Sequence, residues 1–146
     1  MNAEPRRQFV DTNILVYAHD GSGGRKYDIA ADLLRRLWAD RQGCLSTQVL
    51  QEFYVTITRK VPHPLASPAA SDIIAQLAVW HVHRPDTQDI LSAISLQARY
   101  GIAFWDAMII QSASRLGCEV VWSEDLSEGQ HYGDVLVRNP FSLLIE

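Results

Sequence analysis

Short apolar runs of the kind found in β-strands alternate along this chain with longer segments of helical period. In the helical segments apolar residues recur three and four positions apart, as in Ile29, Leu33, Leu34 and Leu37. The strand-like runs cover residues 7–11, 44–46, 81–84, 119–123 and 135–139. Such alternation is typical of α/β proteins, because parallel strands must be joined by long crossover segments. We therefore predict an α/β fold with a mainly parallel, five-stranded sheet.

Length and composition indicate one domain. The chain has 146 residues, of which 47% are hydrophobic, and it contains no internal repeat or interdomain linker. We therefore expect a single domain spanning residues 1–146. No apolar run approaches the roughly 18 residues of a membrane span, and the first residues lack the apolar stretch of a signal peptide. We accordingly expect a cytoplasmic protein without a membrane partner.

Four acidic residues lie where apolar segments end or begin: Asp11, Glu52, Asp106 and Asp125. Functional sites of open parallel sheets lie beyond the carboxyl ends of the strands, so we expect these side chains to converge there. Carboxylates in apolar surroundings are costly unless a cation neutralises them, and all-oxygen sites suit Mg2+ or Mn2+. The four acids therefore predict a divalent metal site.

Each acid also has a structural explanation when it is considered alone. Asp11 and Asp106 could be helix N-caps, Asp125 could form a turn, and Glu52 could occupy a solvated helix position. The whole set is harder to explain in this way, because Asp106 is flanked by apolar side chains that disfavour an unpaired carboxylate. The metal site is therefore the preferred interpretation.

Asn13 and Ser123 stand beside two of these acids. Small hydrogen-bonding side chains next to ligating carboxylates can orient them or hold a bound water, although both residues are also common in turns. His81 and His83 share one face of a strand, but no H-x3-H pair exists, so we do not expect histidine ligands. Cys44 and Cys118 show no metal or redox spacing and are expected to be buried thiols.

The charge balance excludes some classes of function and leaves others open. A net charge of -4 argues against a protein that coats nucleic acid, but local basic groups such as Arg59 with Lys60 could still contact it. A phosphoacceptor receiver domain would need an acidic pair after the first strand and a lysine after the last strand, and the lysines are Lys26 and Lys60. A phosphatase of the haloacid dehalogenase type would need a second aspartate where Asn13 stands.

The segments DTNILVY, QVLQEFY, FWDAMI and WSEDL together resemble a PIN domain, specifically the VapC-type toxins of prokaryotic toxin–antitoxin pairs. The resemblance extends over residues 9–140. It places the acids of the family on Asp11, Glu52, Asp106 and Asp125, and its polar residues on Asn13 and Ser123. It also selects Asp125 as the final acid and leaves Glu124 as a neighbour that faces solvent.

The resemblance implies a three-layer α/β/α fold and an endoribonuclease that cuts RNA with one or two Mg2+ or Mn2+ ions. Family members usually form homodimers and are inhibited by an antitoxin protein whose tail enters the acidic groove. Exposed apolar residues, including Trp38, Tyr54 and Trp80, could serve such contacts or could belong to the core. The alternative function is a catalytically inactive PIN-like module that binds RNA or protein.

Overall fold

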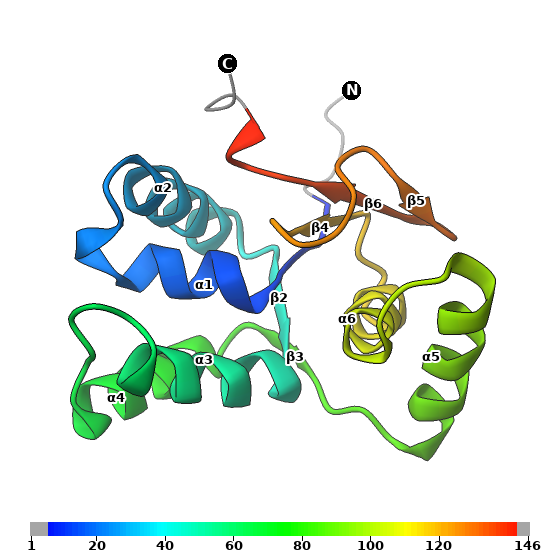
Figure 1. The fold of residues 1–146 in the computed structure, drawn as a ribbon, viewed down its shortest axis with the longest axis horizontal. Coiled ribbons are helices and arrows are strands. Elements are labelled where there is room, and N and C mark those ends of the chain that lie inside the picture. Colours follow the sequence, from blue (N-terminus) through cyan, green and yellow to red (C-terminus); the bar gives the residue numbers. More distant parts are fainter. Residues whose placement is uncertain (1–5, 143–146) are drawn as a thin grey trace.

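A mainly parallel sheet lies between two layers of helices in the computed structural model, which describes residues 6–142 (Figure 1). The strands are β1 (Gln8–Val10), β2 (Gly43–Ser46), β3 (His81–His83), β4 (Val120–Trp122), β5 (His131–Tyr132) and β6 (Val135–Arg138). Their order in the sheet is β3-β2-β1-β4-β6-β5, and only β5 runs antiparallel to its neighbour. The predicted three-layer α/β/α class is confirmed.

The sheet has six strands, one more than predicted. The additional strand, β5, is only two residues long and pairs with β6. Two residues are too few to produce the alternation of apolar and polar positions by which a strand is recognised in a sequence. The extra strand lies at the edge of the sheet and leaves the central order unchanged.

The helices are α1 (Thr12–His19), α2 (Arg25–Asp40), α3 (Thr47–Arg59), α4 (Ser67–Leu77), α5 (Thr87–Tyr100) and α6 (Phe104–Arg115), with a short 3-10 helix η1 (Gly21–Gly23). Helices α1 to α4 contact one another on one side of the sheet, and α5 packs against α6 on the other (Figure 1). Within residues 6–142, no helix is long and apolar enough to cross a membrane.

The core surrounds β1, which is hydrogen-bonded to β2 on one side and β4 on the other. Phe9 and Val10 of β1 are fully buried, as are Phe53 of α3 and Ile110 of α6, which come from opposite layers. Burying a side chain of this size stabilises a fold by about 1.5–3 kcal/mol. Apolar side chains therefore pack against both faces of the central strand.

Hydrogen bonds at the helix ends account for most of the boundaries. Asp86 and Asp89 form a capping box at the start of α5. Ser46 caps α3 by accepting a hydrogen bond from Val49 N at 3.3 Å. The first residue of each helix depends on backbone angles that a sequence pattern does not report.

Helix α4 begins without a side-chain cap. Ala66 occupies the N-cap position and forms no side-chain hydrogen bond, and Ser67 is the first helical residue. Pro68 suits the first turn because its missing N–H would lack a partner there in any case. The Ser67 hydroxyl lies 2.8 Å from the Tyr54 hydroxyl of α3.

A buried polar network joins β3, α5 and α6. Asp89 of α5 is fully buried, and its carboxylate accepts hydrogen bonds from Arg115 at 2.9 Å and from Gln111 at 3.0 Å. His83 Nε2 lies 3.1 Å from the same carboxylate, and His83 Nδ1 lies 2.8 Å from the Ser112 hydroxyl. These contacts hold α5 against α6, so the role of His83 is structural.

Candidate active site

The four predicted acids lie at the same end of the sheet. Asp11 follows β1 directly, Asp125 follows β4 in a loop, Asp106 lies in the first turn of α6, and Glu52 lies in the second turn of α3, which begins where β2 ends. Burial raises the pKa of Asp11, and the charges of Asp125 and Asp106 add to this effect. Burial likewise raises the pKa of Asp106, together with the charges of Asp125 and Glu52. Asp106 and Asp125 are therefore within electrostatic reach of Asp11, and Glu52 is within reach of Asp106.

Asp11 is buried and combines a structural role with a place in the acidic cluster. It is the N-cap of α1, and its Oδ1 accepts a hydrogen bond of 2.7 Å from Thr12 N. Its Oδ2 accepts a hydrogen bond of 2.8 Å from the Ser123 hydroxyl. Burial raises its pKa to about 6, because desolvation of the charged form outweighs these two hydrogen bonds. Asp11 is therefore a helix N-cap, as it could be when it is considered alone. Its hydrogen bonds in this role do not neutralise the charge of the carboxylate.

Ser123 connects two of the acids. It lies one residue beyond β4, is fully buried, and donates its hydroxyl proton to Asp11. The same oxygen accepts a hydrogen bond from Asp125 N at 3.2 Å. Ser123 therefore sets the distance between the end of β1 and the loop that carries Asp125, as expected for a residue that supports the acids.

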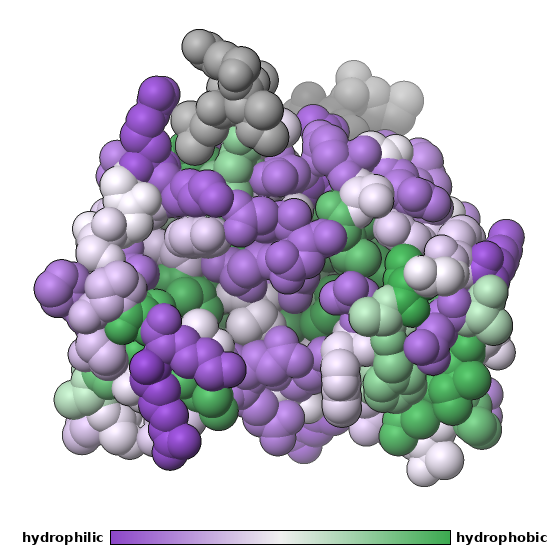
Figure 2. Space-filling view, in the orientation of Figure 1, coloured by the Kyte–Doolittle hydropathy of each residue, from purple (hydrophilic) through white to green (hydrophobic). Residues whose placement is uncertain are grey.

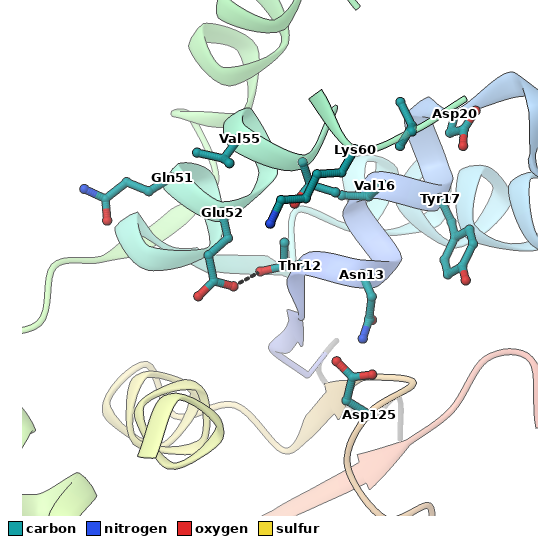
Figure 3. A pocket seen from close by; sticks show the side chains of 12 residues that line it. Thr12, Asn13, Val16, Tyr17, Asp20, Gln51, Glu52, Val55, Lys60 and Asp125 are labelled. Carbon is teal, nitrogen blue, oxygen red and sulfur yellow. Dashed lines mark hydrogen bonds between the residues drawn. The ribbon is translucent and has the colours of Figure 1, made fainter. Parts of the chain in front are cut away.

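Glu52 is held by two residues that the sequence did not single out. Thr12 donates its hydroxyl proton to Glu52 Oε2 at 2.8 Å, and Gln48 donates to Glu52 Oε1 at 3.0 Å (Figure 3 shows the bond to Thr12). Gln48 could have been found, because it lies four positions before Glu52 on the same helix face. Thr12 is forty positions away, and no local spacing predicts its contact with Glu52.

Asp106 and Asp125 are less enclosed than Asp11. Asp106 is half-buried and does not cap α6, since Ala103 occupies the N-cap position. Its pKa is raised by burial and then by the charges of Asp125 and Glu52. Asp125 is exposed and lines the cavity that Figure 3 shows.

Glu124 was expected to face solvent, but it does not. It is half-buried, it forms an ion pair with Lys26, and it accepts a hydrogen bond of 3.2 Å from the Tyr17 hydroxyl. The chain turns immediately after β4, so the alternation of strand side chains no longer applies at this position. Glu124 thus ties the loop to α1 and α2, while Asp125 points to the cavity.

Asn13 supports the same loop from α1. Its Oδ1 accepts a hydrogen bond of 3.4 Å from Glu124 N. Its Nδ2 is buried and has no hydrogen-bond partner among the described residues, and in Figure 3 it points toward Asp125. A buried donor without an acceptor is unfavourable, so Asn13 Nδ2 is a polar group that the described residues leave unsatisfied.

The residues expected to offer apolar contacts differ in exposure. Trp38 is 40% exposed, Tyr54 is half-buried, and Trp80 is buried against Gly43. The clearest apolar surface lies elsewhere, on α5, where Figure 2 shows hydrophobic side chains together at the lower right. It includes Ile90, Leu91 and Ile94. Exposed apolar groups of this kind commonly mark a contact with another protein.

The donor set of the acidic cluster suits a hard divalent cation. It contains four carboxylates, and within residues 6–142 no lysine, arginine or histidine forms an ion pair with any of them. In the described part of the chain no three His, Cys, Asp or Glu side chains are already grouped so that they could hold a metal ion. Mutual repulsion keeps such carboxylates apart when no cation lies between them.

The fold matches solved structures of toxins. VapC20 from Mycobacterium tuberculosis, described as a Sarcin-Ricin loop cleaving toxin, is 23% identical and has a TM-score of 0.62, with 81% of this chain and 91% of that chain covered. A toxin–antitoxin complex from Klebsiella pneumoniae is 20% identical, with a TM-score of 0.66 and coverage of 91% and 97%. The DNA-bound VapBC of Salmonella typhimurium is 18% identical, with a TM-score of 0.65 and coverage of 93% and 99%.

The family comparison is more direct than these structural likenesses. No curated protein matches the sequence. The sequence profile described as PIN domain matches residues 9–127, a range that begins in β1 and ends just beyond Asp125. This range contains all four acids together with Asn13 and Ser123. The chain therefore belongs to the PIN domain family.

Proposed function

We propose that this PIN domain is a metal-dependent endoribonuclease and the toxin of a VapBC-type toxin–antitoxin pair. The observation that carries the proposal is the state of Asp11. It is a buried carboxylate beside three further acids, with a raised pKa and no basic partner among the described residues. A fold that maintains this unfavourable arrangement is expected to use it for function.

In the proposed reaction, water hydrolyses a phosphodiester bond of RNA. Asp11, Glu52 and Asp106 would hold Mg2+ or Mn2+, and Asp125 would complete the cluster. A bound divalent cation lowers the pKa of a water molecule and stabilises negative charge on the phosphate oxygens. The carboxylates of the chain would supply the negative charge that retains the cation, so no nucleophilic side chain is needed.

The neighbouring side chains would keep the acids in position for this chemistry. Thr12 and Gln48 hold the two oxygens of Glu52, and Ser123 holds one oxygen of Asp11. Hydrogen bonds of this type fix the orientation of a ligating carboxylate and restrict its rotation. The single buried acid, Asp11, would be the most constrained ligand, and the exposed Asp125 the least.

The proposal also includes an antitoxin protein and a homodimer. The structures from Klebsiella pneumoniae and Salmonella typhimurium are toxin–antitoxin complexes, and their folds are similar to this one. An arginine of an inhibitor could pair with the carboxylates of the site, and the apolar side chains of α5 could lie in an interface between proteins. Co-expression with the product of an adjacent gene should relieve growth arrest.

The test is cleavage of cellular RNA by the purified protein, with the ends mapped. Cleavage should require Mg2+ or Mn2+, stop in EDTA and disappear in Asp11→Asn. Asp72→Asn, an exposed change on α4, is the matched control and should cut as the wild type does. RNA binding without cleavage under all metal conditions would instead favour the inactive binding module.

A further inference from the structure

A cavity of about 680 Å³ opens beside the acids, between α1 and α3 (Figure 3). Glu52 and Asp125 line one side of it, so a molecule in the cavity would be next to the acidic cluster. Its other walls come from α1, from α3 and from the segment that follows α3. The cavity is thus continuous with the proposed reaction centre.

One basic side chain enters this acidic cavity. Lys60, at the C-cap of α3, is the only lysine or arginine among the described residues that line it, whereas Asp20, Glu52 and Asp125 contribute negative charge. In Figure 3 the amino group of Lys60 points toward the side of the cavity that Glu52 lines. Lys60 forms no ion pair with any residue in the range 6–142. Its charge is therefore available to an anionic ligand.

The remaining wall is apolar. Val16, Val55 and Val61 line it together with the ring of Tyr17. Val55 is 42% exposed and is therefore accessible to a ligand. The flat faces of an unpaired base are apolar, and proteins bind single-stranded RNA by placing such bases against aromatic and apolar side chains.

Asn13 lines the cavity near Asp125. Its Nδ2 is enclosed by the protein, so the cavity offers a ligand the cation of Lys60 and the apolar wall. A cation and an apolar wall suit the phosphate and the base of one unpaired nucleotide.

We propose that this cavity holds an unpaired nucleotide next to the bond that is cut, with Lys60 bound to its phosphate and the valine wall against its base. This inference rests on the proposed ribonuclease function and adds Lys60 as a residue that positions the substrate. Lys60 would position the substrate without taking part in the chemical step. The positive charge of Lys60 would allow a polyanion to bind at a site whose other charged groups repel it.

The first test measures how binding depends on salt. A short fluorescein-labelled single-stranded RNA is titrated with the protein in EDTA, where cleavage is absent, at several KCl concentrations. Each phosphate contact on a single strand contributes about 0.7 to the slope of log K against log salt, so Lys60→Ala should reduce the slope by about 0.7. Lys60→Arg should retain the wild-type slope, because it keeps the charge.

Arg35→Ala is the matched control. Arg35 is exposed on α2, lies outside the cavity and carries the same charge, so its removal should leave the slope unchanged. In Mg2+ or Mn2+, Lys60→Ala should raise KM about tenfold and leave kcat near the wild-type value, since a charged hydrogen bond is lost in substrate binding only. A duplex RNA should bind more weakly than the single strand.

The outcomes separate the two proposals. If the wild type cuts RNA but Lys60→Ala and Arg35→Ala have equal slopes and equal KM values, Lys60 does not bind the substrate and the inference is wrong. If Lys60→Ala alters only the binding of an inhibitory protein, the cavity belongs to a protein partner and the inference is also wrong. If the wild type neither binds nor cuts RNA, the proposed function itself fails.

Discussion

The hydroxyl of Ser123 donates a 2.8 Å hydrogen bond to Oδ2 of Asp11, the one fully enclosed carboxylate of the acidic cluster. The bond joins the ends of two adjacent parallel strands, β1 and β4. It lowers the pKa of Asp11 but does not offset the burial that raises it to about 6. The buried acid is therefore held in place at a cost to the stability of the fold.

That cost predicts the behaviour of Asp11→Asn. The folded-state pKa of about 6 lies above the usual 3.8, so the free energy of unfolding falls as pH rises from about 4 through 6. A shift of about two pKa units corresponds to about 3 kcal/mol. In EDTA at pH 7, Asp11→Asn should therefore be more stable than the wild type by up to this amount, since asparagine retains an acceptor for Thr12 N. Urea denaturation at several pH values measures the difference.

The same experiment tests the alternative that Asp11 acts mainly as the cap of α1. At low pH, where Asp11 is protonated in the wild type, the two proteins should converge in stability. A substantial loss of stability in Asp11→Asn at pH 7 would mean that the cap of α1 needs the charged carboxylate and that repulsion within the cluster is weak.

Thr12→Val should impair catalysis and lower stability, because it removes a hydrogen bond to a charged group. The change removes the hydroxyl that holds Glu52 Oε2 and keeps the shape of the side chain. A hydrogen bond to a charged group contributes about 1.5–3 kcal/mol, which corresponds to a loss of roughly tenfold or more in kcat/KM. Thr12→Ser keeps the hydroxyl and should restore most of the rate. Equal rates for valine and wild type would show that Gln48 alone orients Glu52.

Asp125→Asn and Glu124→Gln should have different consequences although the residues are adjacent. Asp125 lines the cavity, so its substitution should lower activity and weaken metal binding, although less than Asp11→Asn, because water can partly replace an exposed ligand. Glu124 pairs with Lys26 away from the acids, and its substitution should cost less than about 1 kcal/mol and leave the rate unchanged. Kinetics and isothermal titration with Mn2+ measure both; a larger rate loss in Glu124→Gln would reverse the assignment.

Asp89→Asn tests the network that joins α5 to α6. Burial alone would raise the pKa of Asp89, but hydrogen bonds and the charges of His83 and Arg115 outweigh burial and lower the pKa to about 2. Its stabilisation is therefore present above the usual carboxyl pKa and is lost as pH falls toward about 2. Removing one partner of a buried charge network costs about 3–5 kcal/mol, so the Tm at pH 7 should fall markedly. Asp72→Asn on the surface of α4 should not change it.

The sequence predicted the layers and the acids because both depend on local patterns. The apolar period of Ile29, Leu33, Leu34 and Leu37 identified α2. The acids were recognisable because they interrupt apolar segments at the carboxyl ends of strands, where a parallel sheet collects its functional groups. Their chemical role remains a prediction.

Contacts between distant segments were not predictable. The bond from Thr12 to Glu52 depends on the packing of α1 against α3, and the cavity that Lys60 lines arises from the same packing. Glu124 was misplaced because the strand ends at Trp122, one residue earlier than predicted, and the chain turns there. Side-chain direction beyond the last strand residue is set by the turn, and no periodic pattern continues through it.

The position of β1 at the centre of the sheet has a consequence for motion. Asp11 follows a strand that is bonded on both sides, and its own N–H donates to Trp122 O at 2.9 Å. Asp125 lies in the loop beyond β4, and its N–H donates to the side chain of Ser123 at 3.2 Å and not to a neighbouring strand. Amide hydrogen exchange should therefore be slower at Asp11 than at Asp125. We expect the position of the buried Asp11 carboxylate to vary less in solution than that of the exposed Asp125.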